Sequence, residues 1–437
     1  MANKLSNRAT RFFAGRGAIV GLVVILAVYS FEAYARSREH AMPGLLGDQR
    51  AYLEYARHLY DSNYTVTEDR NRMPVYPFLL SLLYRPEMSD DEFLVRAQTF
   101  TVTLSVLLLA LLFLIWRRFL PALPALGLVA ATAFGVFMYR AGKAQVELLF
   151  YFASFCAFVL LLQTFSKPRW WLALLAGATT GLAHLTKASV LPALIIWVVL
   201  FTAQIIWSFR ANPRRRLAIL ALVLAGFFAV VFPYIQTSKR IYGAYFYNVN
   251  STFVMWCDSS TEAYEFLNTH DKDHWREVPP DERPSFRKYW REHSIREMAQ
   301  RVINGSLDLA TKDLRLIGHY KFVLLVTIAA LVLCLRRPRT AGDVLARNPF
   351  AALFASLFLA GYFLLFAWYD LITGDARFLL SIFVPFVFAG SVFVFRLGRD
   401  RIVSLAGRRI PFEQFFAGLF LGLAMIDVVY NASGLLR

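Results

Sequence analysis

The sequence predicts an all-α polytopic membrane protein, and three observations support this. Hydrophobic residues make up 57% of the 437 residues, and charged residues only 18%. Several apolar runs approach or exceed the ~20 residues that a helix needs to cross ~30 Å of hydrocarbon. Arginine and lysine gather between alternate runs, as they do in loops that set membrane orientation. We therefore expect about eleven transmembrane helices in a single membrane-embedded domain that spans residues 1–437.

Eleven apolar runs are predicted to cross the membrane. They are residues 17–35, 94–116, 121–139, 144–165, 170–185, 190–209, 217–235, 319–335, 349–368, 378–395 and 412–430. The first run has a basic start but no small-residue cleavage site, so we expect it to be retained as a span and not removed as a signal peptide.

Charges near the span ends place the N-terminus in the cytoplasm. Every loop on that side is then basic, whereas the short loops on the other side hold only Arg140 with Lys143, Lys187, and Arg377. The net charge of +17 is explained as an orientation signal, and no nucleic-acid partner is expected. The chain is predicted to be a multi-pass protein of a bacterial inner or plasma membrane.

Two long segments, residues 36–93 and 236–318, face the non-cytoplasmic side in this topology. Helical spacing of apolar residues over 51–60 predicts a juxtamembrane helix on the bilayer surface. A second such helix is expected in the later loop, from Ile295, Met298, Ala299, Val302, Ile303, Leu307 and Leu309. The three cysteines are scattered, which predicts neither a disulfide framework nor a metal site.

The first outer loop carries a dense charged segment, residues 47–77, where chemistry on a lipid-borne substrate is expected. Asp48 begins a helical stretch, and it either caps the free N–H groups of that helix or acts as a general base. Arg72 precedes a stiff turn with two prolines. Its guanidinium either holds a phosphate bidentately, or snorkels or pairs with Glu68 or Asp69.

Three further ionisable residues are predicted at outer span ends. Glu147 opens the fourth predicted span; a charge at membrane depth is a functional hypothesis, although a helix N-terminus also favours an acid. Lys187 can supply positive charge to an anion. Arg377 either pairs with Asp375 or Asp370 or clamps a phosphate. His184 is predicted to be a hydrogen-bonded interhelical residue, because no metal-ligand partner is spaced for it.

Together these positions predict one outer-face site with carboxylates at 48 and 147 and cations at 72, 187 and 377. A carboxylate that activates an acceptor, beside cations that stabilise a leaving phosphate, suits transfer from a phosphate leaving group. The spacing alone leaves other classes open, namely a secondary transporter or a polysaccharide polymerase or ligase. Transporters usually show internal repeats and broken helices at the membrane midplane, whereas polar groups cluster at one face here.

In order along the chain, these motifs resemble those of the type C glycosyltransferases that use polyprenyl-phosphate sugars. The likeness is to the branch of protein O-mannosyltransferases and aminoarabinose transferases. It rests on Gly47-Asp48, the turn at 72–77, Glu147, residues 181–187, and residues 375–378 before a proline-containing span. It covers about the first 200 residues well and the last 120 loosely. Asp48 lacks the second adjacent acid of the eukaryotic mannosyltransferases, and the chain is shorter than the aminoarabinose enzymes.

The resemblance implies an inverting hexosyl- or pentosyltransferase that acts on the non-cytoplasmic face. The donor would be a polyprenyl-phosphate sugar, and the acceptor a lipid, a glycan or a protein. The resemblance implies Asp48 as the base with Glu147 as a second catalytic carboxylate, and Arg72, Lys187 and Arg377 as contacts of the donor phosphate. Tyr52 and Tyr76 would bind substrate. No cofactor is assigned, because some family members use a divalent cation and others do not.

Overall fold

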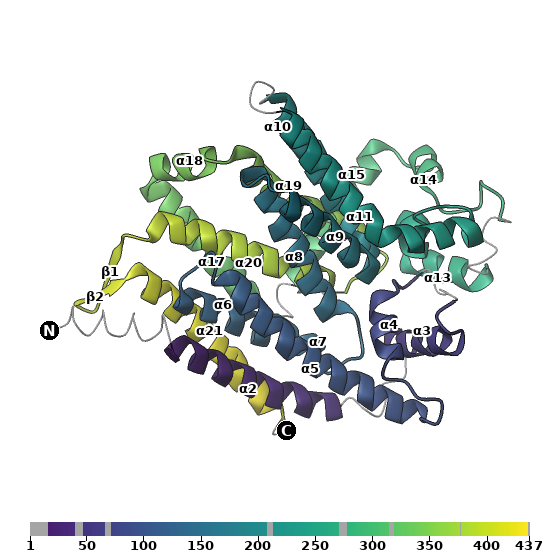
Figure 1. The fold of residues 1–437 in the computed structure, drawn as a ribbon, viewed down its shortest axis with the longest axis horizontal. Coiled ribbons are helices and arrows are strands. Elements are labelled where there is room, and N and C mark those ends of the chain that lie inside the picture. Colours follow the sequence, from purple (N-terminus) through teal and green to yellow (C-terminus); the bar gives the residue numbers. More distant parts are fainter. Residues whose placement is uncertain are drawn as a thin grey trace.

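The computed structural model describes residues 16–39, 47–65, 71–207, 213–270, 278–313, 319–375 and 377–435. Over these ranges the regular secondary structure is helical, apart from one β-hairpin (Figure 1). The charges predicted at Glu68 and Asp69 lie outside the described residues.

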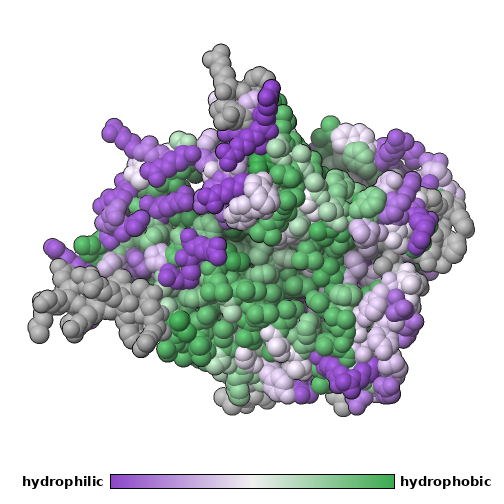
Figure 2. Space-filling model, viewed as in Figure 1, coloured by the Kyte–Doolittle hydropathy of each residue, from purple (hydrophilic) through white to green (hydrophobic). Residues whose placement is uncertain are grey.

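Nine helical segments in the described residues are long and apolar enough to cross a membrane. They are Gly17–Arg38 in α2 (Arg16–Glu39), α5 (Asp90–Trp116), Ala122–Ala141 in α6 to α7, α8 (Glu147–Ser166), Ala188–Trp207 in η2 and α10, α11 (Pro213–Tyr242), α19 (Pro349–Tyr369), α20 (Arg377–Gly398) and Phe412–Ala432 in α21 (Phe412–Leu435). This confirms the predicted all-α polytopic class. Figure 2 shows the corresponding apolar band, with hydrophilic residues gathered near α18 and α10 at one end and near α3 and α14 at the other.

The other two predicted spans form helices at the expected places but are short. They are α9 (Trp170–Thr186) and α17 (Tyr320–Arg336), each of 17 residues. At 1.5 Å per residue each is about 25 Å long, less than the ~30 Å hydrocarbon thickness. Helix length therefore supports nine spans, and the count of eleven stays a prediction.

The remaining elements lie between these helices. Within them are α6 (Ala122–Thr132), η1 (Ala133–Phe137), α7 (Met138–Ala141), η2 (Ala188–Val190) and α10 (Leu191–Trp207). Outside them are α3 (Asp48–Asp61), α4 (Val75–Ser81), α12 (Val249–Thr252), η3 (Val254–Trp256), α13 (Ser260–Thr269), α14 (Phe286–Glu292), α15 (Ile295–Asp308), η5 (Leu309–Asp313) and α18 (Pro338–Ala346). Strands β1 (Ile402–Leu405) and β2 (Arg408–Pro411) pair antiparallel between α20 and α21.

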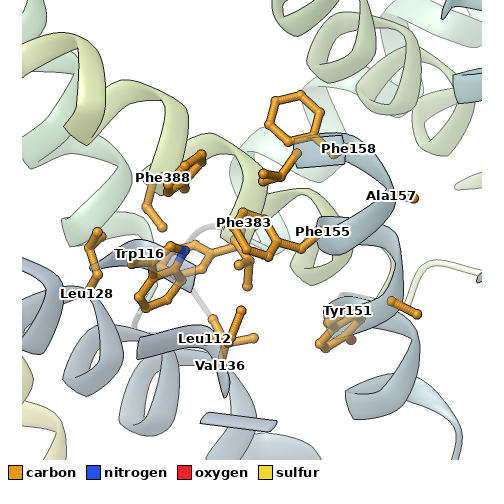
Figure 3. Packing of buried hydrophobic residues seen from close by; sticks show 14 of the residues in the cluster. Leu112, Trp116, Leu128, Val136, Tyr151, Phe155, Ala157, Phe158, Phe383 and Phe388 are labelled. Carbon is orange, nitrogen blue, oxygen red and sulfur yellow. The ribbon is translucent and has the colours of Figure 1, made fainter. Parts of the chain in front are cut away.

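Aromatic packing joins α5, α8 and α20 in the centre of the bundle (Figure 3). The ring of Phe155 lies 6.0 Å from that of Trp116 and 5.1 Å from that of Phe388, centroid to centroid. These edge-on contacts are the arrangement that aromatic rings prefer. Because α8 begins at Glu147 and α20 at Arg377, this core fixes where those two charged residues meet.

Helices are present at both places where juxtamembrane helices are predicted, and they bury different kinds of residue against the protein. Helix α3 buries its apolar stripe, including Tyr52 and Leu59. In α15 the buried residues are Arg301 and Gly305, and Ile303 is 51% exposed. The cause is the close approach of the α15 backbone to that of α19. A Cβ on Gly305 would lie 1.9 Å from the Ala367 carbonyl oxygen of α19. The backbone contact turns the glycine inward and leaves apolar residues at the surface.

Candidate functional site

The structure brings all five predicted charged residues to one end of the helical bundle. Asp48 opens α3, Glu147 opens α8 and Arg377 opens α20; Lys187 directly follows α9, and Arg72 lies three residues before α4. Lys187 Nζ lies 3.7 Å from Glu147 Oε1. Helix α9 therefore ends at the level where α8 begins, as an antiparallel pair requires. The convergence depends on helix ends that are distant in sequence.

Asp48 is held between two arginines. Arg72 Nη2 donates to Oδ1 over 2.8 Å, and Arg377 Nη1 donates to Oδ2. Burial alone would raise the pKa of Asp48, but Arg377 and Arg72 outweigh it and lower the pKa from an ordinary 3.8 to about 2. Gly47 is the N-cap residue of α3, with no side-chain cap hydrogen bond. Asp48 is therefore the first helical residue and an ion-pair partner, not the cap.

Lowering the pH should remove the stability that the Asp48 carboxylate supplies. Since its folded pKa is depressed, that contribution is present above about pH 4 and is lost as the pH falls toward 2. The depression corresponds to about 2 kcal/mol. We expect the free energy of unfolding of wild type to exceed that of Asp48→Asn by this amount at pH 7, as measured by denaturant unfolding in detergent. The difference should close below about pH 3.

Asp61→Asn is the control for that titration, because Asp61 ends the same helix and is exposed. Its free energy of unfolding at pH 7 should stay close to that of wild type, as expected for an exposed side chain. A gap between wild type and Asp48→Asn that stays constant down to pH 2.5 would contradict the ion-paired state of Asp48.

Arg377 is the hub of the cluster. Its Nη1 lies 3.5 Å from Glu147 Oε1, and its Nε lies 3.2 Å from Asp375 Oδ2. Its backbone N–H also donates to Asp375 Oδ1 over 2.9 Å. The Tyr151 hydroxyl donates to the Arg377 carbonyl oxygen over 2.8 Å. One guanidinium thus contacts three carboxylates, which are those of Asp48, Glu147 and Asp375.

Glu147 is the most buried acid of the cluster, with 2% of its side chain exposed. Its ion pairs to Lys187 and Arg377 are long, and its Oε2 atom has no hydrogen-bond partner in the described part of the chain. Burial lowers the pKa of Lys187, and Glu147 opposes that effect. A buried oxygen without a partner is costly, so this atom is suited to accept a hydrogen bond from a bound hydroxyl.

Two residues of the cluster were not among the predicted site residues. Arg140 Nη2 donates to Asp375 Oδ1 over 2.6 Å, which extends the ion-pair chain beyond Arg377. Arg140 had been interpreted only as an outer-loop cation that marks orientation. Asp375 had been interpreted as one alternative partner of Arg377 and as part of the motif at residues 375–378, but not as a site residue. Nothing in the sequence links the two, because they are 235 residues apart.

Positive charge exceeds negative charge in this part of the described structure. The carboxylates are Asp48, Glu147 and Asp375, and the cations paired with them are Arg72, Arg140, Lys187 and Arg377. Four cations against three carboxylates leave an excess of one positive charge. A phosphodiester, which carries one negative charge, would balance that excess.

The two predicted tyrosines lie beneath the cluster. Tyr76 is fully buried and shares a 2.7 Å hydrogen bond with Thr101. Its ring packs edge-on against Tyr52 at 5.3 Å, and the Arg72 guanidinium lies 5.5 Å from the centre of the Tyr52 ring. Tyr76 therefore supports Tyr52, which in turn supports Arg72. A direct substrate contact by either tyrosine stays a prediction.

Neutral contacts fix the loops that carry the charges. Ala144 N–H, just before α8, donates to Gln49 Oε1 over 2.8 Å. The Tyr234 hydroxyl of α11 donates to Met73 Sδ over 3.7 Å, which anchors the residue next to Arg72. Predicted as an interhelical residue, His184 is 3% exposed and its ring lies 6.0 Å from that of Phe227.

The described residues contain no group of three or more His, Cys, Asp or Glu that could hold a metal ion. In the cluster, each carboxylate contacts an arginine. Metal dependence therefore stays as open as the sequence left it. Cys156, Cys257 and Cys334 are free thiols.

Comparison with known proteins gives one similar solved structure. No protein-family model matches the chain, and no curated protein matches it. The solved structure is that of ArnT from Cupriavidus metallidurans bound to undecaprenyl phosphate. The two sequences are 15% identical; the match covers 95% of this chain and 71% of ArnT, with a TM-score of 0.45. A likeness of this degree carries no argument about activity, which has to come from the cluster itself.

Proposed function

We propose that the protein is a membrane glycosyltransferase that moves a sugar from a polyprenyl-phosphate donor to an acceptor on the non-cytoplasmic face. The observation that carries the proposal is the bridge from Arg72 through Asp48 to Arg377, inside a cluster where cations outnumber carboxylates by one. Such a cluster combines a carboxylate with a phosphate-binding fork. It lies where helix ends meet, within reach of a lipid-anchored substrate.

The chemistry is a displacement at the anomeric carbon of the donor sugar. An acceptor oxygen forms a bond to that carbon while the bond to the phosphate oxygen breaks, and Asp48 takes the acceptor's proton. The phosphate leaves with its charge increased from −1 to −2. Arg72 and Arg377 stabilise the charge that develops on it. A single displacement of this kind inverts the sugar configuration.

The ion pairs of Asp48 also account for when the base becomes active. A carboxylate with a pKa of about 2 is a weak base at neutral pH, and catalytic bases work best nearer the operating pH. When a donor phosphate engages Arg72 and Arg377, Asp48 loses part of its counter-charge and its pKa rises. Donor binding would thus strengthen the base when it is needed, while Glu147 continues to hold Lys187 and offers Oε2 to a sugar hydroxyl.

Removing Arg72 should weaken donor binding. We expect Arg72→Ala in lipid nanodiscs to bind a polyprenyl phosphate about tenfold more weakly, or about 1.4 kcal/mol, as measured by native mass spectrometry. The fold should persist, because Asp48 keeps Arg377. Arg57→Ala is the matched control, since Arg57 pairs with Asp90 away from the cluster. Wild-type affinity in Arg72→Ala would remove Arg72 from the phosphate site.

A further inference from the structure

A cavity lies at the opposite end of the bundle from the ionic cluster. Its volume is about 480 Å³, and it is lined by Pro168, Arg169, Trp170, Trp171, Arg215, Ala218, Ile219 and Leu222. These residues lie just before and at the start of α9 and along the N-terminal part of α11. Lys187 follows the other end of α9, so this cavity and the cluster are separated by the length of that helix.

The close packing of α9 and α11 fixes the cavity walls. A Cβ on Gly177 would lie 2.0 Å from the Val223 carbonyl oxygen, and one on Gly226 would lie 2.6 Å from the Leu174 carbonyl oxygen. The two backbones are therefore in direct contact there. The cavity lies nearer the N-terminal ends of the two helices than these glycines do, where Trp171 of α9 and Ala218 of α11 line it.

The electrostatics of this cavity favour an anion. Helix α9 begins at the cavity, where its N-cap residue Arg169 and its first residues Trp170 and Trp171 are lining residues, so the positive end of its helix dipole lies beside the cavity. Arg169 is the N-cap residue of α9, with no side-chain cap hydrogen bond. Arg215 is also a lining residue, and its Nε donates a hydrogen bond to the Pro168 carbonyl oxygen over 3.1 Å.

The rest of the lining suits a lipid better than a soluble anion. Trp170 is 66% exposed and Trp171 46% exposed, and tryptophan is enriched at membrane–water interfaces. Ala218, Ile219 and Leu222 make an apolar wall that continues along a membrane-spanning helix. In the predicted topology the loop before α9 faces the cytoplasm. Basic pockets between transmembrane helices on that side are known to bind anionic headgroups.

We infer that this cavity binds an anionic phospholipid, with the phosphodiester at Arg169, Arg215 and the start of α9, and an acyl chain along α11. The site is independent of the proposed transferase activity. It would anchor the α9–α11 pair, whose far end carries Lys187, in its surrounding leaflet.

The test uses the full-length protein in detergent, titrated with phosphatidylglycerol or with phosphatidylcholine of the same chains, and read by native mass spectrometry. Wild type should prefer phosphatidylglycerol. The Arg169→Ala/Arg215→Ala double variant should lose at least tenfold in that affinity. The Arg336→Ala/Arg339→Ala double variant is the matched control, because both residues are exposed and outside the cavity; it should keep wild-type affinity.

A second experiment distinguishes binding of the whole lipid from binding of its headgroup alone. Glycerol phosphate at millimolar concentration should not displace the lipid, and chain-brominated phosphatidylglycerol should quench tryptophan fluorescence less in Trp170→Phe/Trp171→Phe than in wild type. Equal losses in the two arginine double variants would indicate general attraction to basic surfaces and overturn the site. Displacement by glycerol phosphate, or unchanged quenching in the tryptophan variant, would overturn the lipid as its ligand.

Discussion

Asp48→Asn should lower the rate of sugar transfer by about two to four orders of magnitude, the range that general-base catalysis supplies. The amide keeps the size of the carboxylate but cannot take the acceptor's proton at neutral pH. The amide oxygen can still accept a hydrogen bond from Arg72 or Arg377, so the variant should remain folded and bind donor. Initial transfer rates in proteoliposomes, with donor binding measured in parallel, separate the two effects.

Asp61→Asn is the control for this experiment as well. Asp61 lies at the last position of α3 and Asp48 at the first, so both changes remove one carboxylate from the same helix. Only Asp48→Asn should slow transfer. Wild-type transfer by Asp48→Asn would contradict its assignment as the base.

Arg377→Ala should affect both binding and catalysis. We expect donor affinity to fall about 100-fold, or about 2.8 kcal/mol, and the transfer rate at saturating donor to fall as well, because the guanidinium stabilises the leaving phosphate most in the transition state. The loss is expected without unfolding. Asp48 keeps Arg72, Glu147 keeps Lys187, and Asp375 keeps Arg140.

Two variants define the role of the Arg377 side chain. Arg377→Lys keeps the charge but loses the planar fork, so it should recover only part of the donor affinity. Arg396→Ala removes an exposed arginine near the other end of the same helix and should behave as wild type. A donor affinity within twofold of wild type in Arg377→Ala would contradict the phosphate contact.

The fold class was predictable because long apolar helices leave a direct mark on composition. The number of spans was less so, because α9 and α17 have apolar sequences but only 17 helical residues each. The face of α15 that packs against the protein was not predicted, for a different reason. Apolar spacing cannot show that Gly305 permits a backbone contact with α19, and that contact decides which face turns inward.

The meeting of Asp48, Arg72, Glu147, Lys187 and Arg377 followed from topology, since a consistent alternation of spans puts all five on one side. Their pairing did not. The bridge from Asp48 to Arg377 joins residues 329 apart, and side-chain geometry alone decides that both arginines share one carboxylate. For the same reason the sequence did not show that Arg140 belongs to the site, since its partner Asp375 lies in a loop distant in sequence.

Mass spectrometry of glycolipids and surface glycans tests the transferase proposal most directly. Cells that carry the wild-type gene would be compared with cells that lack it and with cells that carry only Asp48→Asn. We expect one sugar-bearing species to disappear in both altered strains, while a sugar-charged polyprenyl phosphate accumulates. Identical glycolipid and glycan profiles with and without the gene would contradict the proposal.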